Sequence, residues 1–193
     1  HVSVSPNLQT GRSMPLETRA IVAMAGAFGY ELDVRKTGQE ERKRIKEQIQ
    51  WYKQYQELIL YGDYYRLTPV ESNREFAAWQ VVSRDKKTAV VSAVCLHARS
   101  NPLFWRVRLK GLKEDTWYQV RQVRLTDCSG KDREQEQKEG QDENPAKREE
   151  LLCLGSGLMY GGVNLPVFWR DYESVLYVIE EADKRGGGLP GER

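Results

Sequence analysis

The chain has 193 residues, which is enough for one domain together with part of a second. Its 30 lysine and arginine residues nearly balance its 28 acidic residues, and the resulting net charge of +2 argues against a nucleic-acid-binding surface. No apolar run approaches the ~18–20 residues of a membrane-spanning helix, and no signal peptide is visible. The chain starts with His1 in what reads as a strand, which predicts a start within a domain.

Residues 1–62 are predicted to contain two helices with a short strand between them. Pro15 suits the first turn of a helix that ends near Ala25, with Ser13 or Met14 as its cap. A narrow face of small side chains favours close packing of this helix against a neighbour: Leu16, Ala20, Ala23 and Ala27. The residues from Tyr30 to Val34 then alternate as a strand does.

The second helix has the clearest local signals in the sequence. Thr37 and Glu40 have the spacing of a capping box, which predicts a helix from Thr37 to Leu60 that Gly62 brings to an end. The apolar residues recur at helical period, so they are expected to form one buried stripe: Ile45, Ile49, Tyr52 and Ile59, widened by Trp51 and Tyr55.

From residue 63 the hydrophobic period changes from helical to twofold. The expected strands are rich in β-branched and aromatic residues and are separated by turn residues: Tyr64–Leu67, Ala77–Ser83, Thr88–Cys95, Phe104–Leu109, Trp117–Leu125, Leu151–Leu154 and Ser174–Ile179. Short strands without intervening helices predict an antiparallel sandwich or barrel over residues 63–182. The glycines from Gly155 to Gly162 are expected to form a hairpin at its edge.

Two segments have no core-forming pattern. Residues 129–150 are dominated by charged side chains and glutamine, and we interpret them as a charged insertion in a hairpin loop. Residues 183–193 are rich in glycine and predict a disordered tail.

The cysteines and histidines give no sign of a metal site or a cofactor. Cys95, Cys128 and Cys153 are widely spaced, and His1 and His97 are the only histidines. Free thiols fit a reducing compartment, so we expect a cytoplasmic protein with neither metal nor cofactor.

The order of several sequence blocks resembles the family 36 glycoside hydrolases of the α-galactosidase type. Collinear blocks over about seventy residues carry the resemblance: His1–Ser3, Pro6–Asn7, Gln9–Arg12, Pro15–Arg19, Val22–Met24, Phe28–Asp33 and Tyr61–Leu67. The resemblance continues more loosely through the later strands. It implies that residues 1–62 are the end of a (β/α)8 barrel, with its seventh helix at Pro15–Ala25 and its eighth strand at Phe28–Leu32. The α+β fold implied is this barrel end followed by the antiparallel sandwich.

The sequence departs from the family pattern at three places. Leu8 stands where the family usually has a histidine, Ala20 stands where it tends to have glycine, and the insertion at 129–150 is foreign to it. Because the loop containing Leu8 lies on the active-site side in the family, no polar role is transferred to that position.

The resemblance implies an enzyme whose catalytic groups lie outside this chain. Family members hydrolyse α-galactosides with retention, using two aspartates that retaining enzymes hold ~5–5.5 Å apart. The nucleophile follows a Lys-Trp-Asp-like strand end that is absent here, and the acid/base precedes the block at His1–Ser3. We therefore expect the chain alone to be inactive, with the missing barrel portion, α-galactoside oligosaccharides and further copies of the chain as partners of the intact enzyme.

Other residues give weaker functional signals. Glu31 and Asp33 would share a face of the barrel strand, but a role in tying this strand to the next helix explains them better. Glu17 and Arg19 are interpreted as a surface or interhelical charge set. Asn7, Gln9 and Arg12 are candidates for substrate binding through their place in the resemblance. Core packing is expected for most tryptophans of the sandwich, which are Trp79, Trp105 and Trp117, whereas Trp169 is expected to be exposed.

Three functional hypotheses remain at this point. The first is a non-catalytic part of an α-galactosidase that closes the barrel and supports assembly. The second is a stand-alone carbohydrate-binding β-sandwich that uses exposed aromatic rings, and the third is an interaction protein that uses the charged insertion. The two N-terminal helices favour the first, because a free-standing binding module has no use for them. With their partners missing, they should expose apolar surface and cause self-association.

Overall fold

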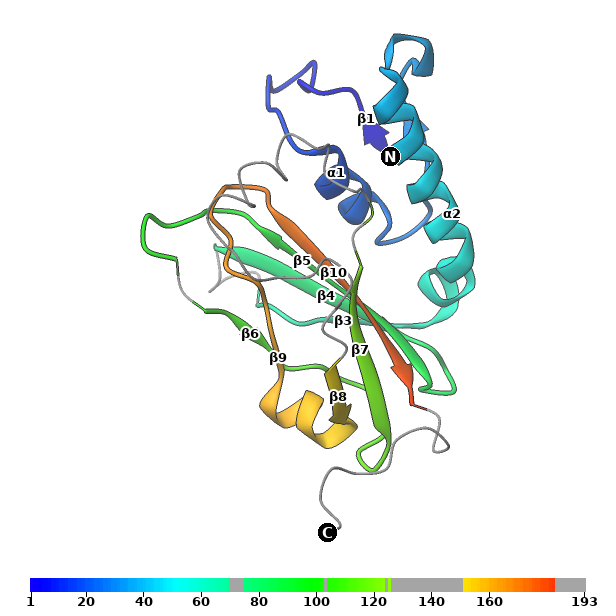
Figure 1. Cartoon of the computed structure of the whole chain (residues 1–193), viewed down its shortest axis with the longest axis vertical. Coiled ribbons are helices and arrows are strands. Elements are labelled where there is room, and N and C mark those ends of the chain that lie inside the picture. Colours follow the sequence, from blue (N-terminus) through cyan, green and yellow to red (C-terminus); the bar gives the residue numbers. More distant parts are fainter. Residues whose placement is uncertain (70–74, 103, 124, 126–150, 183–193) are drawn as a thin grey trace, which may run out of the picture.

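The computed structural model describes residues 1–69, 75–102, 104–123, 125 and 151–182 (Figure 1). The predicted insertion at 129–150, the predicted tail at 183–193 and Cys128 lie outside these residues. At the centre stands a six-stranded sheet with the order β3-β4-β5-β10-β7-β8. Helices α1 and α2 lie over one face of this sheet, and the small pair β6-β9 lies over the other (Figure 1).

The elements follow one another in the order β1 (Val2–Ser3), α1 (Leu16–Ala23), β2 (Tyr30–Glu31), η1 (Val34–Lys36), α2 (Gln39–Tyr61), β3 (Asp63–Arg66), β4 (Phe76–Val82), β5 (Thr88–Cys95), β6 (Arg106–Val107), β7 (Trp117–Val123), β8 (Leu151–Leu154), η2 (Gly157–Gly161), β9 (Val163–Asn164) and β10 (Ser174–Glu181). The strand bounds at Thr88–Cys95 and Leu151–Leu154 agree with the sequence prediction. The prediction for Phe104–Leu109 was too long, and β9 was not predicted.

The starts of both helices differ from their predicted positions. Pro15 occupies the N-cap position of α1 in extended conformation, so this helix begins one residue later and has no side-chain cap. Gly38 is the N-cap of α2, and the capping box predicted for Thr37 was wrong. The Thr37 hydroxyl instead donates to the Val34 carbonyl at 2.7 Å, because it closes the 3₁₀ turn η1 that precedes α2.

The buried stripe of α2 largely follows the predicted period. Ile45, Tyr52, Tyr55 and Ile59 are buried, whereas Ile49 and Trp51 are half-buried. The stripe also contains Gln48, which is fully buried and accepts a hydrogen bond from the Tyr30 hydroxyl. The polar side chain at a core position was not predicted, since its partner lies on a different element.

The six-stranded sheet is antiparallel throughout, and its central strands are buried on both faces of the sheet. Along β10, Val175, Tyr177 and Ile179 belong to one core, and the alternating Leu176 and Val178 belong to the other. The first core lies between the sheet and the β6-β9 side, and the second lies between the sheet and the helices. Two-sided burial explains why the central strands read as nearly continuous apolar runs.

The segment after β8 forms a helical turn rather than the predicted hairpin. Gly157–Gly161 is one turn of π-helix, and it buries Leu158 in the core on the β6-β9 side. The turn ends at Gly162, whose φ of 83° suits glycine. Because a single helical turn has too few residues to show a period, glycine content alone favoured the wrong structure.

A small parallel sheet joins the N-terminus to the helices. β1 pairs with β2 in parallel, with Val2 opposite Tyr30 and Ser3 opposite Glu31, and α1 makes the crossover between them. A strand–helix–strand unit of this kind is the repeating unit of α/β folds. Val2 is fully buried in the same core as the sheet residues Leu176 and Val178, so the unit and the sheet form one body.

Candidate functional site

The loop that follows β1 is held by Asn7. Its side-chain carbonyl accepts hydrogen bonds from the amide of Gln9 at 3.1 Å and from the amide and hydroxyl of Thr10 at 3.0 and 3.1 Å. The Asn7 amide donates to the Arg12 carbonyl and the Gly11 amide donates to the Asn7 carbonyl, both at 2.8 Å. This network uses the Asn7 acceptor to shape the loop, which is an Asx-type turn.

The two other loop candidates lie at the surface. Gln9 and Arg12 are exposed, and in the described part of the chain their side chains form no hydrogen bond or ion pair. Leu8, at the position where a histidine was expected, is 89% exposed. The structure therefore places Asn7, Gln9 and Arg12 in one loop at the carboxyl end of β1, with Gln9 and Arg12 free to contact a molecule beyond it.

Arg19 fixes both ends of this loop, a role that the sequence did not indicate. Its Nη1 donates to the carbonyl of Ser3, the last residue of β1, and its Nε donates to the Met14 carbonyl at 3.2 Å. Its Nη2 also lies 3.9 Å from Glu41 of α2. The interhelical pairing was foreseen, but the Arg19 side chain is only 13% exposed, so it is not a surface charge. Burial lowers the pKa of Arg19, and Glu41 opposes this shift.

Removing the Arg19 clamp should loosen the loop without unfolding the sheet. In the variant Arg19→Ala, the two carbonyls of Ser3 and Met14 lose a charged donor, which weakens local order. We expect amide hydrogens between Ser5 and Met14 to exchange about tenfold faster, as measured by hydrogen–deuterium exchange mass spectrometry. The control Arg12→Ala, at an exposed position, should leave these rates unchanged; equal rates in both variants would contradict the clamp.

The carboxylates near β2 have separate partners. Asp33 caps η1, where its Oδ1 accepts from the Arg35 amide at 3.1 Å and from the Arg35 Nε at 2.9 Å. The Arg35 guanidinium holds the pKa of Asp33 below its usual range. Glu31 instead lies 3.8 Å from the Nδ1 of His1. The two carboxylates were expected to tie this strand to the start of the next helix; instead, Asp33 caps η1, which precedes α2, and Glu31 faces His1.

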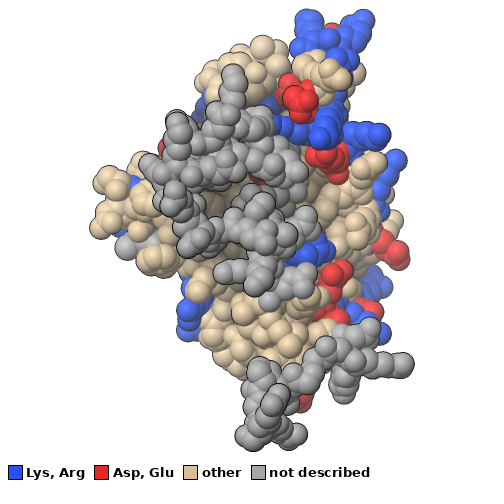
Figure 2. All heavy atoms as spheres, viewed as in Figure 1, with Lys and Arg blue, Asp and Glu red and all other residues tan. Residues whose placement is uncertain are grey.

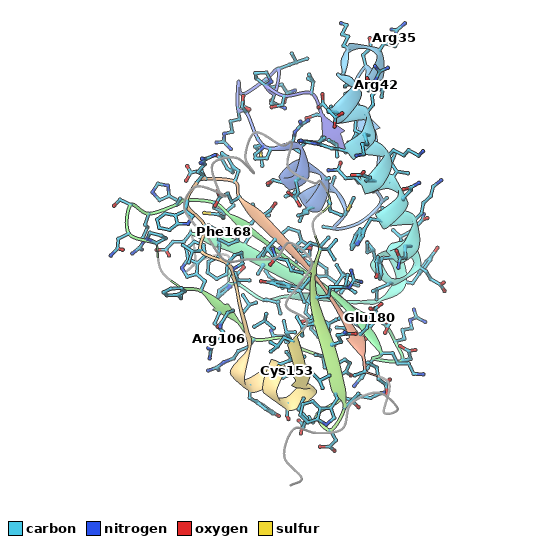
Figure 3. The ribbon with its side chains drawn as sticks, viewed as in Figure 1. Arg35, Arg42, Arg106, Cys153, Phe168 and Glu180 are labelled. Atoms are coloured by element: carbon cyan, nitrogen blue, oxygen red, sulfur yellow. The ribbon has the colours of Figure 1, made fainter. Side chains whose placement is uncertain are left out.

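Trp169 lies in the loop between β9 and β10 and is 68% exposed, as predicted. The backbone around it is held by the Trp169 amide, which donates to the Glu173 Oε2 at 2.7 Å. Trp105 is half-buried and stacks on Phe76 with the ring centroids 4.5 Å apart. It also contacts Phe168, which Figure 3 labels on the sheet side of this loop.

The prediction of core packing fails for Trp117, which is 42% exposed. Its position explains this difference, since it begins β7 and pairs with Leu154 of the edge strand β8. Trp79 is half-buried against the core that includes the helices.

Helix α1 is joined to the six-stranded sheet by polar contacts that were not predicted. Thr18 is only 1% exposed, and its hydroxyl donates to the Tyr172 carbonyl at 2.5 Å and lies 2.9 Å from the Ser174 hydroxyl at the start of β10. The Leu125 amide donates to the Glu17 Oε1 at 3.1 Å. Glu17 is therefore a contact between α1 and the residues after β7.

Comparisons with known proteins match both parts of this architecture. Residues 76–179, which cover β4 to most of β10, match the family described as "Glycosyl hydrolase family 36 C-terminal domain". Residues 1–62, which cover the strand–helix–strand unit and α2, match the family described as "Melibiase". The chain belongs to glycosyl hydrolase family 36.

Two curated relatives of this family 36 chain cover nearly all of it. The bifunctional α-galactosidase/sucrose kinase AgaSK of Mediterraneibacter gnavus is 38% identical over 186 residues, which is 96% of this chain and 17% of the relative. The α-galactosidase AgaA of Geobacillus stearothermophilus is 35% identical over 181 residues, or 93% of this chain and 21% of the relative. The chain thus spans about a fifth of the length of these relatives.

Solved family 36 structures have the same fold over this length. The galactosidase domain of AgaSK superposes with a TM-score of 0.77 at 36% identity, covering 94% of this chain and 22% of that one. AgaA superposes with a TM-score of 0.76 at 32% identity, covering 94% and 21%. The sequence blocks predicted the C-terminal segment of a family 36 α-galactosidase. These matches confirm that prediction.

The described part of this family 36 segment lacks two features. Among the described residues, no group of three or more histidine, cysteine, aspartate or glutamate side chains is placed to hold a metal ion. Over the same part of the chain, no helix combines the length and the apolar character that crossing a bilayer requires.

Proposed function

We propose that this chain is the part of an α-galactosidase that closes the catalytic barrel and joins it to the antiparallel domain, and that it carries neither catalytic carboxylate. The intact enzyme would hydrolyse terminal α-galactosides with retention. The family membership and the names of the relatives support the activity. The parallel pair β1-β2 with its helices supports the barrel end, because parallel strands with helical crossovers build such barrels.

The observation that carries the proposal is the core shared by the helices and the sheet. Ile21 of α1 and Tyr52 of α2 are buried together with Val94 of β5 and Leu176 of β10. Thr18 and Glu17 add hydrogen bonds across the same interface. A segment built this way can hold the end of a barrel in a fixed position, which is a structural role in catalysis rather than a chemical one.

The partner of the segment would be the N-terminal region of the same enzyme. The relatives are several times longer than this chain, which is consistent with such a region. A reducing compartment belongs to the proposal, because Cys95 and Cys153 are free thiols. Assembly of further copies, and self-association of the isolated chain, remain predictions that sedimentation analysis can test.

A chimera tests the proposed function. In full-length AgaA, the matching segment is replaced by residues 1–193 of this chain, and hydrolysis of a chromogenic α-galactoside is measured. We expect the chimera to be active, and we expect both the isolated chain and AgaA without its segment to be inactive. Turnover by the isolated chain, or a folded chimera without activity, would contradict the proposal.

The exposed ring of Trp169 favours a second candidate function, which is sugar binding by the isolated chain. Stacking of a pyranose on this ring would change its fluorescence. A raffinose titration of the chain and of Trp169→Ala separates the two functions. Saturable binding that Trp169→Ala abolishes would favour the binding module over the structural role.

A further inference from the structure

A groove on α2 combines an apolar floor with a basic rim. Val34, Ile45 and Ile49 form the floor, and the positive charges of Arg42, Lys46 and Lys53 surround it. Its volume is about 390 Å³. Figure 2 shows lysine and arginine side chains gathered over α2, and Figure 3 labels Arg42 near the N-terminal end of this helix.

The groove lies on a flank of α2 that the rest of the described chain leaves uncovered. At 100° per residue, the buried stripe through Tyr52 and Ile59 faces the sheet, and Trp51 on one side of it packs into the same core. Ile49 and Lys53 lie on the opposite side of the stripe. All residues that line the groove belong to η1 or α2, so no other described element forms a wall of it.

Strand β2, which precedes η1 and α2, also has an uncovered edge. In the described residues β2 pairs only with β1, so its second edge has no strand partner. Because η1 and α2 follow β2 directly, a further strand–helix unit added at that edge would bring its helix alongside α2. An added strand and an added helix would then fill the edge and the groove together.

The charges of the groove identify the chemistry of its occupant. None of the lining residues is acidic, and the rim supplies three cations around apolar side chains. Covering this rim with a neutral or basic surface would bury charges without partners, which is costly. An amphipathic helix with an apolar stripe flanked by aspartate or glutamate would fit this groove. Its apolar stripe would pack on the floor, and its carboxylates would pair with the cations of the rim.

We propose that the basic groove of α2 binds an acidic amphipathic helix from the N-terminal region of the same enzyme. The inference rests on the proposed function, because it takes the partner to be the remaining barrel portion. It goes further in assigning the contact to Lys46, Lys53 and Arg42, and in requiring acidic residues on the partner. A second copy of the chain and a free polyanion are the competing occupants.

The first test reverses charge inside and outside the groove. In the active AgaA chimera, Lys46→Glu with Lys53→Glu should lower the melting temperature by about 2–4 °C. The control Lys36→Glu with Lys43→Glu changes the net charge equally at exposed positions outside the groove and should have no such effect. In the isolated chain, both double variants should melt as the unchanged chain does, since the groove is then empty of its partner.

The second test identifies the occupant directly. A benzophenone cross-linker in place of Gln50, another residue of the groove lining, is irradiated in the chimera and the cross-linked peptide is sequenced. We expect an intramolecular cross-link to an acidic helix of the N-terminal region, reduced about tenfold by the groove double variant. A cross-link between copies, or none, would overturn the inference.

The outcomes separate the inference from the proposed function. A chimera without activity would count against the proposed function, whatever the groove variants show. An active chimera in which groove and control variants behave alike would leave the barrel-closing role standing and overturn the assignment of the groove.

Discussion

Replacing Ile21 with alanine is expected to lower the free energy of unfolding of the chain by about 2–5 kcal/mol. Ile21 lies on α1 and is 1% exposed, in the core that α1 shares with α2 and the six-stranded sheet. Truncation would remove buried apolar surface and leave a cavity between the helices and the sheet. The measurement is urea-induced unfolding followed by circular dichroism.

The neighbouring residue on the same helix provides the control. Val22 is 47% exposed, so Val22→Ala should change the free energy of unfolding by no more than about 0.5 kcal/mol. Both variants should unfold in one transition, because one core joins the two parts. Two separated transitions, with only the first affected by Ile21→Ala, would show that the N-terminal unit and the sheet are independent.

The second large effect is expected at Gly62, which joins α2 to β3. A Cβ at this position would lie 2.6 Å from the carbonyl oxygens of both Leu58 and Val82. Its φ of −77° is ordinary, so the cost arises from crowding rather than from backbone strain. Backbone atoms cannot move aside as a flexible side chain can. Gly62→Ala should therefore destabilise the chain by about 1–3 kcal/mol.

Gly26 is the matched control for this crowding. A Cβ added to Gly26 meets no atom within 4 Å, so Gly26→Ala should be close to neutral in the same urea experiment. Equal midpoints for Gly62→Ala and Gly26→Ala would mean that α2 is not held tightly against the sheet. In that case α2 would not hold the β1-β2 unit in a fixed position relative to the sheet.

The fold was predictable wherever an element was long enough to show a period. The 23-residue helix α2 carries a repeated apolar stripe, and β5 carries an apolar run that only Ser92 interrupts after Thr88. The two-residue strand β9 and the single turn η2 are too short for periodicity, so tertiary pairing decides their structure. The expectation that the helices lack partners was only partly right. α1 and much of α2 pack on the sheet, and the groove remains open.

The candidate site was less predictable, because its contacts join residues far apart in the chain. Thr18 reaches Tyr172 across 154 positions, and no local pattern distinguishes it from an exposed threonine. Arg19 was predicted to belong to a surface or interhelical charge set, and no local pattern indicated that it also holds the ends of the loop after β1. Asn7 was found through the family resemblance, but its hydrogen bonds shape the loop rather than leave it free for a ligand.

The most direct test of barrel closure is the protection of β2 against hydrogen exchange. Deuterium uptake of the peptide spanning residues 28–33 is compared in the isolated chain and in the AgaA chimera under identical conditions. If this segment closes the barrel, β2 gains a second strand partner and its uptake falls sharply in the chimera. Equal uptake in the two proteins would mean that β2 remains an open edge and would contradict the barrel-closing role.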